Sequence, residues 1–175
     1  MYYSNWSGMS DIANVIQIQR GLGASKLAIS SVGGTVNFVM KSAEKNRGGF
    51  IYQGFANDNY LKSTVSYYTG MNENGWATSL LFTHWQGDGY AEGTYGQGQT
   101  YFVSVGYKAN DKHSFNFLLT GAPQNHDEQF SQSIQSFIDK GIKFNDNIGY
   151  VGNVYKTEET NFYHKPVFNF CWDYN

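Results

Sequence analysis

The sequence predicts a mostly β protein, and its composition gives three reasons. Twenty glycines occur with only two prolines, together with 14 tyrosines and 13 phenylalanines, and aromatic residues favour strands over helices. Charged residues make up only 15% of the 175 residues, against about 25% in an average soluble domain. The mean hydropathy of −0.48 and the lack of a run of about 20 apolar residues exclude a transmembrane helix. Transmembrane β-barrels have this composition, because their lipid-facing and lumen-facing residues alternate.

Six stretches from about residue 49 onward have the alternation that strands require. In the second stretch, Leu61, Val65 and Tyr67 share one face. The fourth is the clearest, because Tyr or Val recurs at every second position from residue 101 to residue 107. Asn74-Gly75 supplies a dipeptide that favours a hairpin turn. The six predicted strands cover residues 50–57, 60–70, 76–86, 101–108, 114–120 and 167–174.

The connections between these strands alternate in length. Residues 71–75 and 110–113 are short turns, whereas residues 87–98 form a predicted Gly-rich loop and residues 121–166 a long polar excursion. Apolar residues spaced three and four apart predict a short helix over 131–140 within that excursion. Outer-membrane barrels combine short periplasmic turns with long external loops in this way. The first connection, residues 57–59, departs from the pattern, because it is short on what would be the outer side.

Six strands are fewer than the roughly eight that make the smallest filled barrel. We therefore expect an incomplete transmembrane β-barrel that belongs to a larger sheet. The opening residues Met1-Tyr2-Tyr3-Ser4 have neither the basic start nor the apolar core of a signal peptide. Because an outer-membrane protein needs such a peptide, we expect the N-terminal part of the protein to be missing from this sequence.

The residues before the predicted barrel carry a motif of their own. A strand ends at Arg20-Gly21, small residues follow, and a Gly-Gly-x-Val-Asn sequence leads into a second strand ending at Lys41. This pattern resembles the end of the plug domain in TonB-dependent outer-membrane receptors. The stretches 5–11, 121–126 and 164–166 look like the SusC-like, Bacteroidetes branch of that family. The plug-motif residues are Arg20, Gly21, Gly23, Gly33, Gly34 and Asn37.

The resemblance implies both an architecture and a function. Residues 1–41 would be the C-terminal part of an α/β plug domain, residues 42–48 a linker, and residues 49–175 the first barrel strands with a long external loop at 121–166. The family imports bulky nutrients by rearranging the plug. The SusC-like match favours an oligosaccharide or a peptide, and a siderophore or cobalamin remains open. Such a chain is a transporter and not an enzyme, has no cofactor, and resides in the outer membrane.

The resemblance also implies partners. The TonB energy-transducing complex would act through the missing N-terminal segment, and a SusD-like surface lipoprotein would cover the barrel. Outer-membrane lipid would contact the aromatic positions. Arg20 would hold barrel carboxylates from the plug side; the alternative is an exposed arginine at the end of a strand. The lipid-facing positions predicted from the alternation are Tyr67, Tyr101, Tyr107, Phe115, Phe168 and Trp172.

Three aromatic residues are candidates for substrate contact. Trp85, Tyr90 and Tyr95 lie at or beyond a predicted strand end, beside the Gly-rich loop. Aromatic rings at such a place can stack on sugar rings, which would suit a glycan importer. The alternative is structural, with one residue in the interfacial girdle and two anchoring the loop.

The sequence gives little support to other classes of functional site. One cysteine excludes an internal disulfide and a Cys-based zinc site, and the four histidines have no metal-ligand spacing. A net charge of −2 offers no basic surface for nucleic acid. The main alternative function is a soluble or surface-attached carbohydrate-binding β-sandwich, which would bury one face of each sheet. A barrel enzyme is less favoured, because no Ser or Asp has an identifiable catalytic partner.

Overall fold

The computed structural model describes residues 8–21 and 33–174, and most of them lie in antiparallel strands. The prediction of a mostly β chain is confirmed. No helix in this part of the chain is long and apolar enough to cross a membrane. The helical elements are α1 (Met9–Ile12), η2 (Ser42–Glu44) and α2 (Ile134–Lys140). The strands are β1 (Val15–Arg20), β2 (Gly34–Val39), β3 (Gly48–Phe55), β4 (Leu61–Tyr68), β5 (Trp76–Asp88), β6 (Tyr95–Lys108), β7 (His113–Gly121), β8 (Gln124–Asp127), β9 (Ile148–Val151), β10 (Val154–Thr157), β11 (Thr160–Tyr163) and β12 (Val167–Tyr174).

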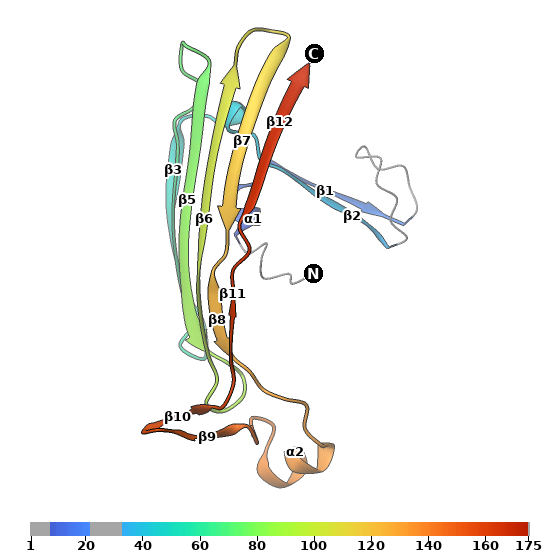
Figure 1. The fold of residues 1–175 in the computed structure, drawn as a ribbon, viewed down its shortest axis with the longest axis vertical. Helices are drawn as coiled ribbons and strands as arrows, with labels where there is room; N and C mark the ends of the chain where they lie inside the picture. The colour runs from blue at the N-terminus through green and yellow to red at the C-terminus, as the bar shows by residue number, and fades with distance from the viewer. Residues whose placement is uncertain (1–7, 22–32, 175) are drawn as a thin grey trace.

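Eight strands of the described chain form one antiparallel sheet. β3, β4, β5, β6, β7 and β12 lie side by side in that order (Figure 1). β6 is long enough to pair with β7 through residues 101–108 and with β8 through residues 96–98, and β8 then pairs with β11. The connections β3–β4, β5–β6 and β8–β11 gather at one end of the sheet, the long-loop end. The connections β4–β5 and β6–β7 lie at the other, the turn end (Figure 1).

The predicted strands correspond to β3–β7 and β12, with one clear error at the Gly-rich stretch. The predicted loop over 87–98 is present only over residues 89–94, because β5 continues to Asp88 and β6 begins at Tyr95. Gly87, Gly96 and Gly98 belong to the sheet, and Gly89 and Gly93 lie in the loop. A Cβ built on Gly98 would lie 2.6 Å from Nε1 of Trp85, so the indole lies directly over this backbone. Glycine in a strand marks such a close approach.

The excursion at 121–166 is more ordered than the prediction of a single external loop. The predicted helix is present as α2, where the Ser133 side chain caps the first turn by accepting from the backbone N–H of Ser136 at 3.1 Å. Gly141 ends α2 with a φ of 99°. The excursion also contains β8 and β11, which extend the main sheet, and the separate β9–β10 hairpin. These strands are only four residues long, which is too short for alternation to reveal.

In an ordinary soluble sheet the buried face is apolar and the exposed face is polar, and in this sheet the two are reversed. Its inner face is buried but rich in hydroxyl and amide side chains, whereas its outer face is exposed and apolar. Buried polar residues of the inner face include Thr64, Ser66, Ser79, Thr83, Thr100, Ser104, Asn116 and Thr120. Exposed apolar residues of the outer face include Ile51, Val65, Tyr67, Leu80, Phe82, Phe117, Phe168, Phe170 and Trp172.

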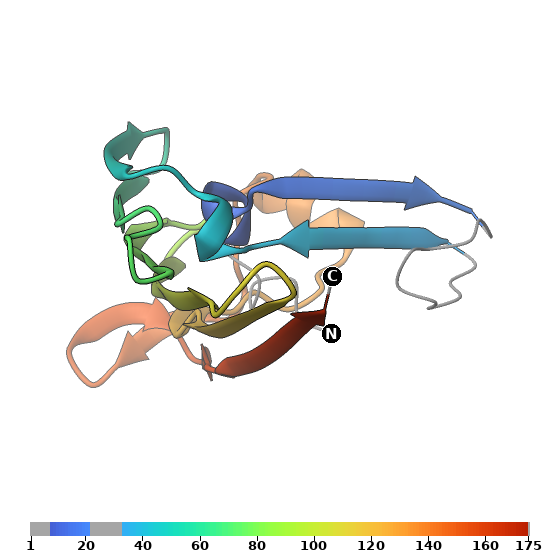
Figure 2. The ribbon, with the colours of Figure 1, turned by 90° about the horizontal axis from the view of Figure 1, so that it is seen from above.

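The inner face is covered by residues 8–14 and 40–44, here called the docked segment, which contains α1 and η2. The sheet curves around α1 and η2, while the β1–β2 hairpin extends away from it (Figure 2). Ile12 is 1% exposed and packs with Leu81, Phe102 and Leu118 in a small apolar core. From η2, the Ser42 hydroxyl donates to the backbone carbonyl of Ser104 at 3.1 Å.

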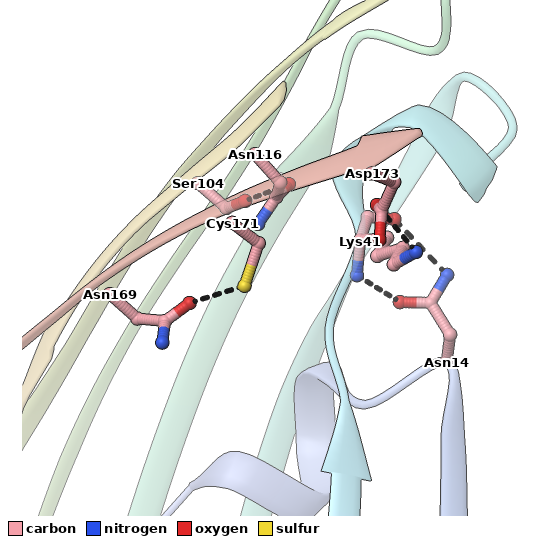
Figure 3. Close-up of polar contacts among 7 residues, drawn as sticks. All are labelled: Asn14, Lys41, Ser104, Asn116, Asn169, Cys171 and Asp173. Carbon is pink, nitrogen blue, oxygen red and sulfur yellow. Dashed lines mark hydrogen bonds and ion pairs between the residues drawn. The ribbon is translucent and has the colours of Figure 1, made fainter. Parts of the chain in front are cut away.

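Two ion pairs add to this apolar anchor. Lys62 of β4 lies 2.9 Å from Asp11 of α1, and Lys41 lies 2.8 Å from Asp173 of β12. The hydrogen bond that the Lys41 ammonium donates to Asp173 (Figure 3) raises the pKa of Lys41, whereas burial lowers the pKa of Lys45. Lys45 lies 4.4 Å above the ring of Tyr68. Each of the two paired lysines therefore joins the docked segment to a strand.

Candidate functional site

The candidate site lies at the long-loop end, where three connections meet. The backbone N–H of Asp88 donates to the carbonyl of Asp58 at 2.8 Å, which joins the end of β5 to the β3–β4 turn. The N–H of Glu92 donates to the carbonyl of Lys143 at 2.8 Å, which joins the β5–β6 loop to the excursion. Asn145 is completely buried and donates to the carbonyl of Glu92 at 3.1 Å. The loops at this end therefore support one another.

A pocket of about 340 Å³ at this end is lined by all three predicted contact residues, Trp85, Tyr90 and Tyr95. We call it the aromatic pocket. Trp85 belongs to the inner face, with its ring over Gly96 and Gly98. Tyr90 projects from the β5–β6 loop and is 58% exposed, and Tyr95 begins β6. The fold therefore brings together the three aromatic residues that the sequence predicts to form one site. Their contact with a substrate stays a prediction.

Other residues of the aromatic pocket did not emerge from the sequence. Tyr60 lies beside the β3–β4 turn, and His126 and Asp127 come from β8. No local pattern identifies the two residues of β8, because β8 is short and falls within the stretch 121–166 that the sequence predicts to be a loop. The Asp127 carboxylate accepts from the Thr160 hydroxyl at 2.7 Å and from the backbone N–H of Tyr95 at 3.2 Å. It therefore ties β11 and β6 together at the pocket wall.

A second, larger cavity of about 610 Å³ adjoins the aromatic pocket and shares Tyr90 and Tyr95 with it. Carboxylates dominate its charged lining, which includes Asp58, Asp88, Glu92 and Asp127. Lys143 lies 3.4 Å from Asp58 and 5.5 Å from the centre of the Tyr90 ring. Carboxylates accept hydrogen bonds from hydroxyl and amine groups, and aromatic faces stack on flat apolar rings. The combined surface can hold a polar ligand several groups long.

The plug-motif residues that the structure describes lie in or beside the β1–β2 hairpin, which extends away from the long-loop end of the sheet (Figure 1). Arg20 pairs with Gly34 at the end of the hairpin, and its side chain is exposed. Among the described residues, no ion pair involves Arg20, so its role toward barrel carboxylates stays a prediction. The Asn37 amide donates to the Gln17 side chain at 3.1 Å across the hairpin. Gly21 and Gly33 flank the hairpin, and Gly23 lies outside the described residues.

All six positions predicted to face lipid lie on the outer face. Near the turn end, several of them form a row of aromatic rings across neighbouring strands. Trp76 stacks on Tyr107 with ring centres 4.4 Å apart, and Tyr107 stacks on Phe115 at 6.4 Å. The Trp172 indole N–H donates to Nδ1 of His113 at 3.2 Å.

Within residues 8–21 and 33–174, no group of three or more His, Cys, Asp or Glu residues is arranged to hold a metal.

Comparison with known proteins adds no identification to this geometry. No protein-family model matches the sequence, and no curated protein is significantly similar to it. The assignment of a function therefore rests on the sequence motifs and the arrangement of side chains.

Proposed function

We propose that this chain is part of an outer-membrane, TonB-dependent active transporter that imports a bulky nutrient, an oligosaccharide or a peptide, by rearranging a plug. The single observation that carries the proposal is the inversion of the sheet. Its buried face bears Thr, Ser and Asn, and its exposed face bears Ile, Leu, Phe and Trp. In water such an outer face is unfavourable by about 25 cal/mol for each Å² of apolar surface left exposed. In a bilayer the same face is stabilising.

The way in which the docked segment is attached to the inner face supports the proposal that it belongs to a plug that can detach. The docked segment is held by two buried apolar side chains, Met9 and Ile12. The hydrogen bond from Ser42 to the Ser104 carbonyl and two partly exposed ion pairs add to these contacts. It also covers hydroxyl groups that it does not satisfy: within the described chain, Ser79 Oγ and Thr100 Oγ1 are buried without a hydrogen-bond partner. Water would satisfy both hydroxyls when the segment leaves, which reduces the free energy needed to release it. Release of such a cover is the motion that transport requires.

The long-loop end supports a nutrient ligand and a surface partner. The aromatic pocket and its acidic neighbour open at the end that faces outward in this proposal. The excursion beside them exposes a set of large apolar side chains. These are Ile134, Ile138 and Ile142 in and after α2, with Tyr150, Val154 and Tyr155 in the β9–β10 hairpin. Exposed apolar groups at this position suit a SusD-like lipoprotein that closes over the pocket.

The alternative of a carbohydrate-binding sandwich finds no comparable support. A sandwich packs the apolar faces of two sheets together, whereas the large apolar side chains on the outer face of this sheet are exposed in the described part of the chain. The polar face is the one that is covered. We therefore keep the transporter as the function that the geometry favours.

A charge introduced on the outer face tests the proposal. Phe82 lies midway along β5 and is 49% exposed. At the bilayer midplane, Phe82→Arg should destabilise the barrel by about 2–4 kcal/mol, whereas on a water-exposed sheet it should cost about 0.5 kcal/mol or less. The assay is the amount of folded full-length protein in the outer-membrane fraction. Glu73→Arg, in the exposed β4–β5 turn, is the control and should leave that amount unchanged. A soluble wild-type protein, with Phe82→Arg equally abundant, would overturn the proposal.

A further inference from the structure

The larger cavity at the long-loop end, here called the acidic cavity, contains the whole excess negative charge of the chain. Four acidic and two basic residues line it: Asp58, Asp88, Glu92, Asp127, Lys143 and Lys156. The chain has 14 acidic and 12 basic residues in all, so acidic and basic residues are equal in number outside this lining. A cavity lined by one sign of charge concentrates ligands of the other sign. The acidic cavity therefore favours a cation.

Glu92 offers a carboxylate in a fixed position. Its backbone N–H donates to the Lys143 carbonyl at 2.8 Å, and its carbonyl accepts from the Asn145 side chain at 3.1 Å. Within the described part of the chain, its carboxylate has no hydrogen-bond or ion partner. The Asp127 carboxylate, by contrast, already accepts two hydrogen bonds. Glu92 can therefore accept from a ligand without losing a contact within the protein.

The chain itself already places an ammonium group in the acidic cavity. Nζ of Lys143 lies 3.4 Å from the Asp58 carboxylate and 5.5 Å from the centre of the Tyr90 ring. A cation over an aromatic face is the arrangement by which aromatic sites recognise ammonium ligands. The side chains of Lys143 and Asp58 are 51% and 33% exposed, so their ion pair is weak. An ammonium group of a ligand can therefore displace Lys143 from this position.

The acidic cavity and the aromatic pocket are joined by residues that line both of them. Asp88, Tyr90, Tyr95 and Asp127 belong to the two linings at once. A ligand whose ammonium group lies in the acidic cavity therefore reaches the aromatic pocket with its next group. There Trp85 offers an aromatic surface to a sugar ring or an apolar group.

We propose that the acidic cavity and the aromatic pocket together bind a cationic oligomer that carries primary ammonium groups. One ammonium group contacts the Glu92 carboxylate and the face of Tyr90, and the neighbouring ring or apolar group lies against Trp85. A neutral analogue keeps the aromatic contact and loses the charged one, so it binds more weakly. Amino-sugar oligomers and lysine peptides share this chemistry. The inference rests on the proposed function, because it names the charge of the nutrient that the transporter takes up.

The test measures the affinity of two matched pairs of ligands by isothermal titration calorimetry at pH 6. One pair is the glucosamine trimer and its N-acetylated form, and the other is trilysine amide and its fully acetylated form. The protein is the full-length chain in detergent micelles, or in buffer if it proves soluble. Acetylation removes the positive charge of each amine. Two contacts with exposed carboxylates, each worth roughly threefold, should make the charged member of one pair bind about tenfold more tightly.

The pair that shows this preference identifies the source of the ammonium group, a sugar or a peptide. High salt should reduce the preference, because it screens exposed charges. Equal affinities within both pairs, or the absence of saturable binding, would overturn the proposal.

Substitutions of exposed residues place the ammonium group within the site. Lys143→Met removes the internal competitor and should tighten binding of the charged ligand about threefold, whereas Glu92→Gln should weaken it about threefold. Lys140→Met is the matched lysine control, because its ammonium lies over the Phe144 ring, outside the acidic cavity. Glu73→Gln, at the turn end, is the control for the carboxylate. Both controls should leave the affinity unchanged. Equal effects of Lys143→Met and Lys140→Met, or no effect of Glu92→Gln, would contradict the assignment.

Failure of this inference can be told apart from failure of the proposed function. Fractionation of the wild type and of Phe82→Arg tests the transporter without any ligand, whereas the titration tests the pockets without any membrane. A protein that resides in the outer membrane and binds charged and neutral ligands equally would overturn only the inference.

Discussion

Replacing Ile12 by Ala tests how strongly this buried side chain holds the docked segment on the sheet. Ile12 is 1% exposed among Leu81, Phe102 and Leu118, and the change removes three buried carbon atoms. At roughly 0.8 kcal/mol for each, docking should weaken by about 2.4 kcal/mol, near the lower end of the usual range for Ile→Ala in a core. The two ion pairs have side chains that are 24–38% exposed. Each should contribute less than about 1 kcal/mol.

A buried thiol beneath the segment provides the assay. Thr100 is 2% exposed, and a Cβ built on Gly8 would lie 2.8 Å from its Cγ2. Its hydroxyl has no hydrogen-bond partner in the described chain, so Thr100→Cys in a Cys171→Ser background loses no such bond. Alkylation of this thiol requires the segment to lift, and Ile12→Ala should accelerate it roughly 50-fold, because 1.4 kcal/mol corresponds to a factor of ten.

The matched control is Ile18→Ala, in the β1–β2 hairpin. Ile18 is 69% exposed, and surface substitutions of this kind usually change stability by less than about 0.5 kcal/mol, or roughly twofold in alkylation rate. The reasoning would be refuted if Ile12→Ala left the rate unchanged. It would also be refuted if Ile18→Ala accelerated alkylation as strongly as Ile12→Ala.

Two further expectations concern the pocket and the Lys41 pair. In a glycan-array titration, Trp85→Ala should weaken the binding of neutral oligosaccharides about tenfold, or ~1.4 kcal/mol. Trp76→Ala, at the turn end, is the control and should leave that binding unchanged. Equal losses of affinity in the two variants would show that Trp85 does not belong to the binding site. Because the pKa of Lys41 is raised above 10.5, its pairing with Asp173 is fully stabilising below that pH and is lost as pH rises through the raised pKa. Thermal melts between pH 8 and 11.5 should therefore show an alkaline decline of less than about 1 kcal/mol that Lys41→Met lacks. Because the pKa of Lys45 is lowered, its contribution to stability changes with pH in the opposite direction, and it does so equally in the wild type and in Lys41→Met. An identical alkaline decline in these two proteins would therefore exclude the Lys41–Asp173 pair as its cause.

The alternation of side chains predicted the long strands well but could not predict the short ones. In β4, Val65 and Tyr67 mark the outer face over eight residues, which is long enough for a period of two to be recognised. β8 has only four residues, and its place in the sheet depends on pairing with β6. Pairing between distant segments leaves no local pattern, so His126 and Asp127 could not be assigned to the pocket.

Glycine misled the sequence reading for a related reason. Gly96 and Gly98 resemble turn residues when read along the chain, but in the sheet they make room for Trp85 on the neighbouring strand. The prediction that Trp85, Tyr90 and Tyr95 belong together survived this error, because a strand end and a loop start lie close in space in either case.

The edges of the sheet have a practical consequence for handling the protein. Within the described residues, β3 and β12 are each hydrogen-bonded on one side only. Both are eight residues long and carry exposed apolar side chains, with Ile51 86% exposed in β3 and Phe168 61% exposed in β12. Long apolar edges of this kind recruit any strand that approaches them. Expression of residues 1–175 alone should therefore yield inclusion bodies in water, and refolding should be attempted in detergent micelles from the start.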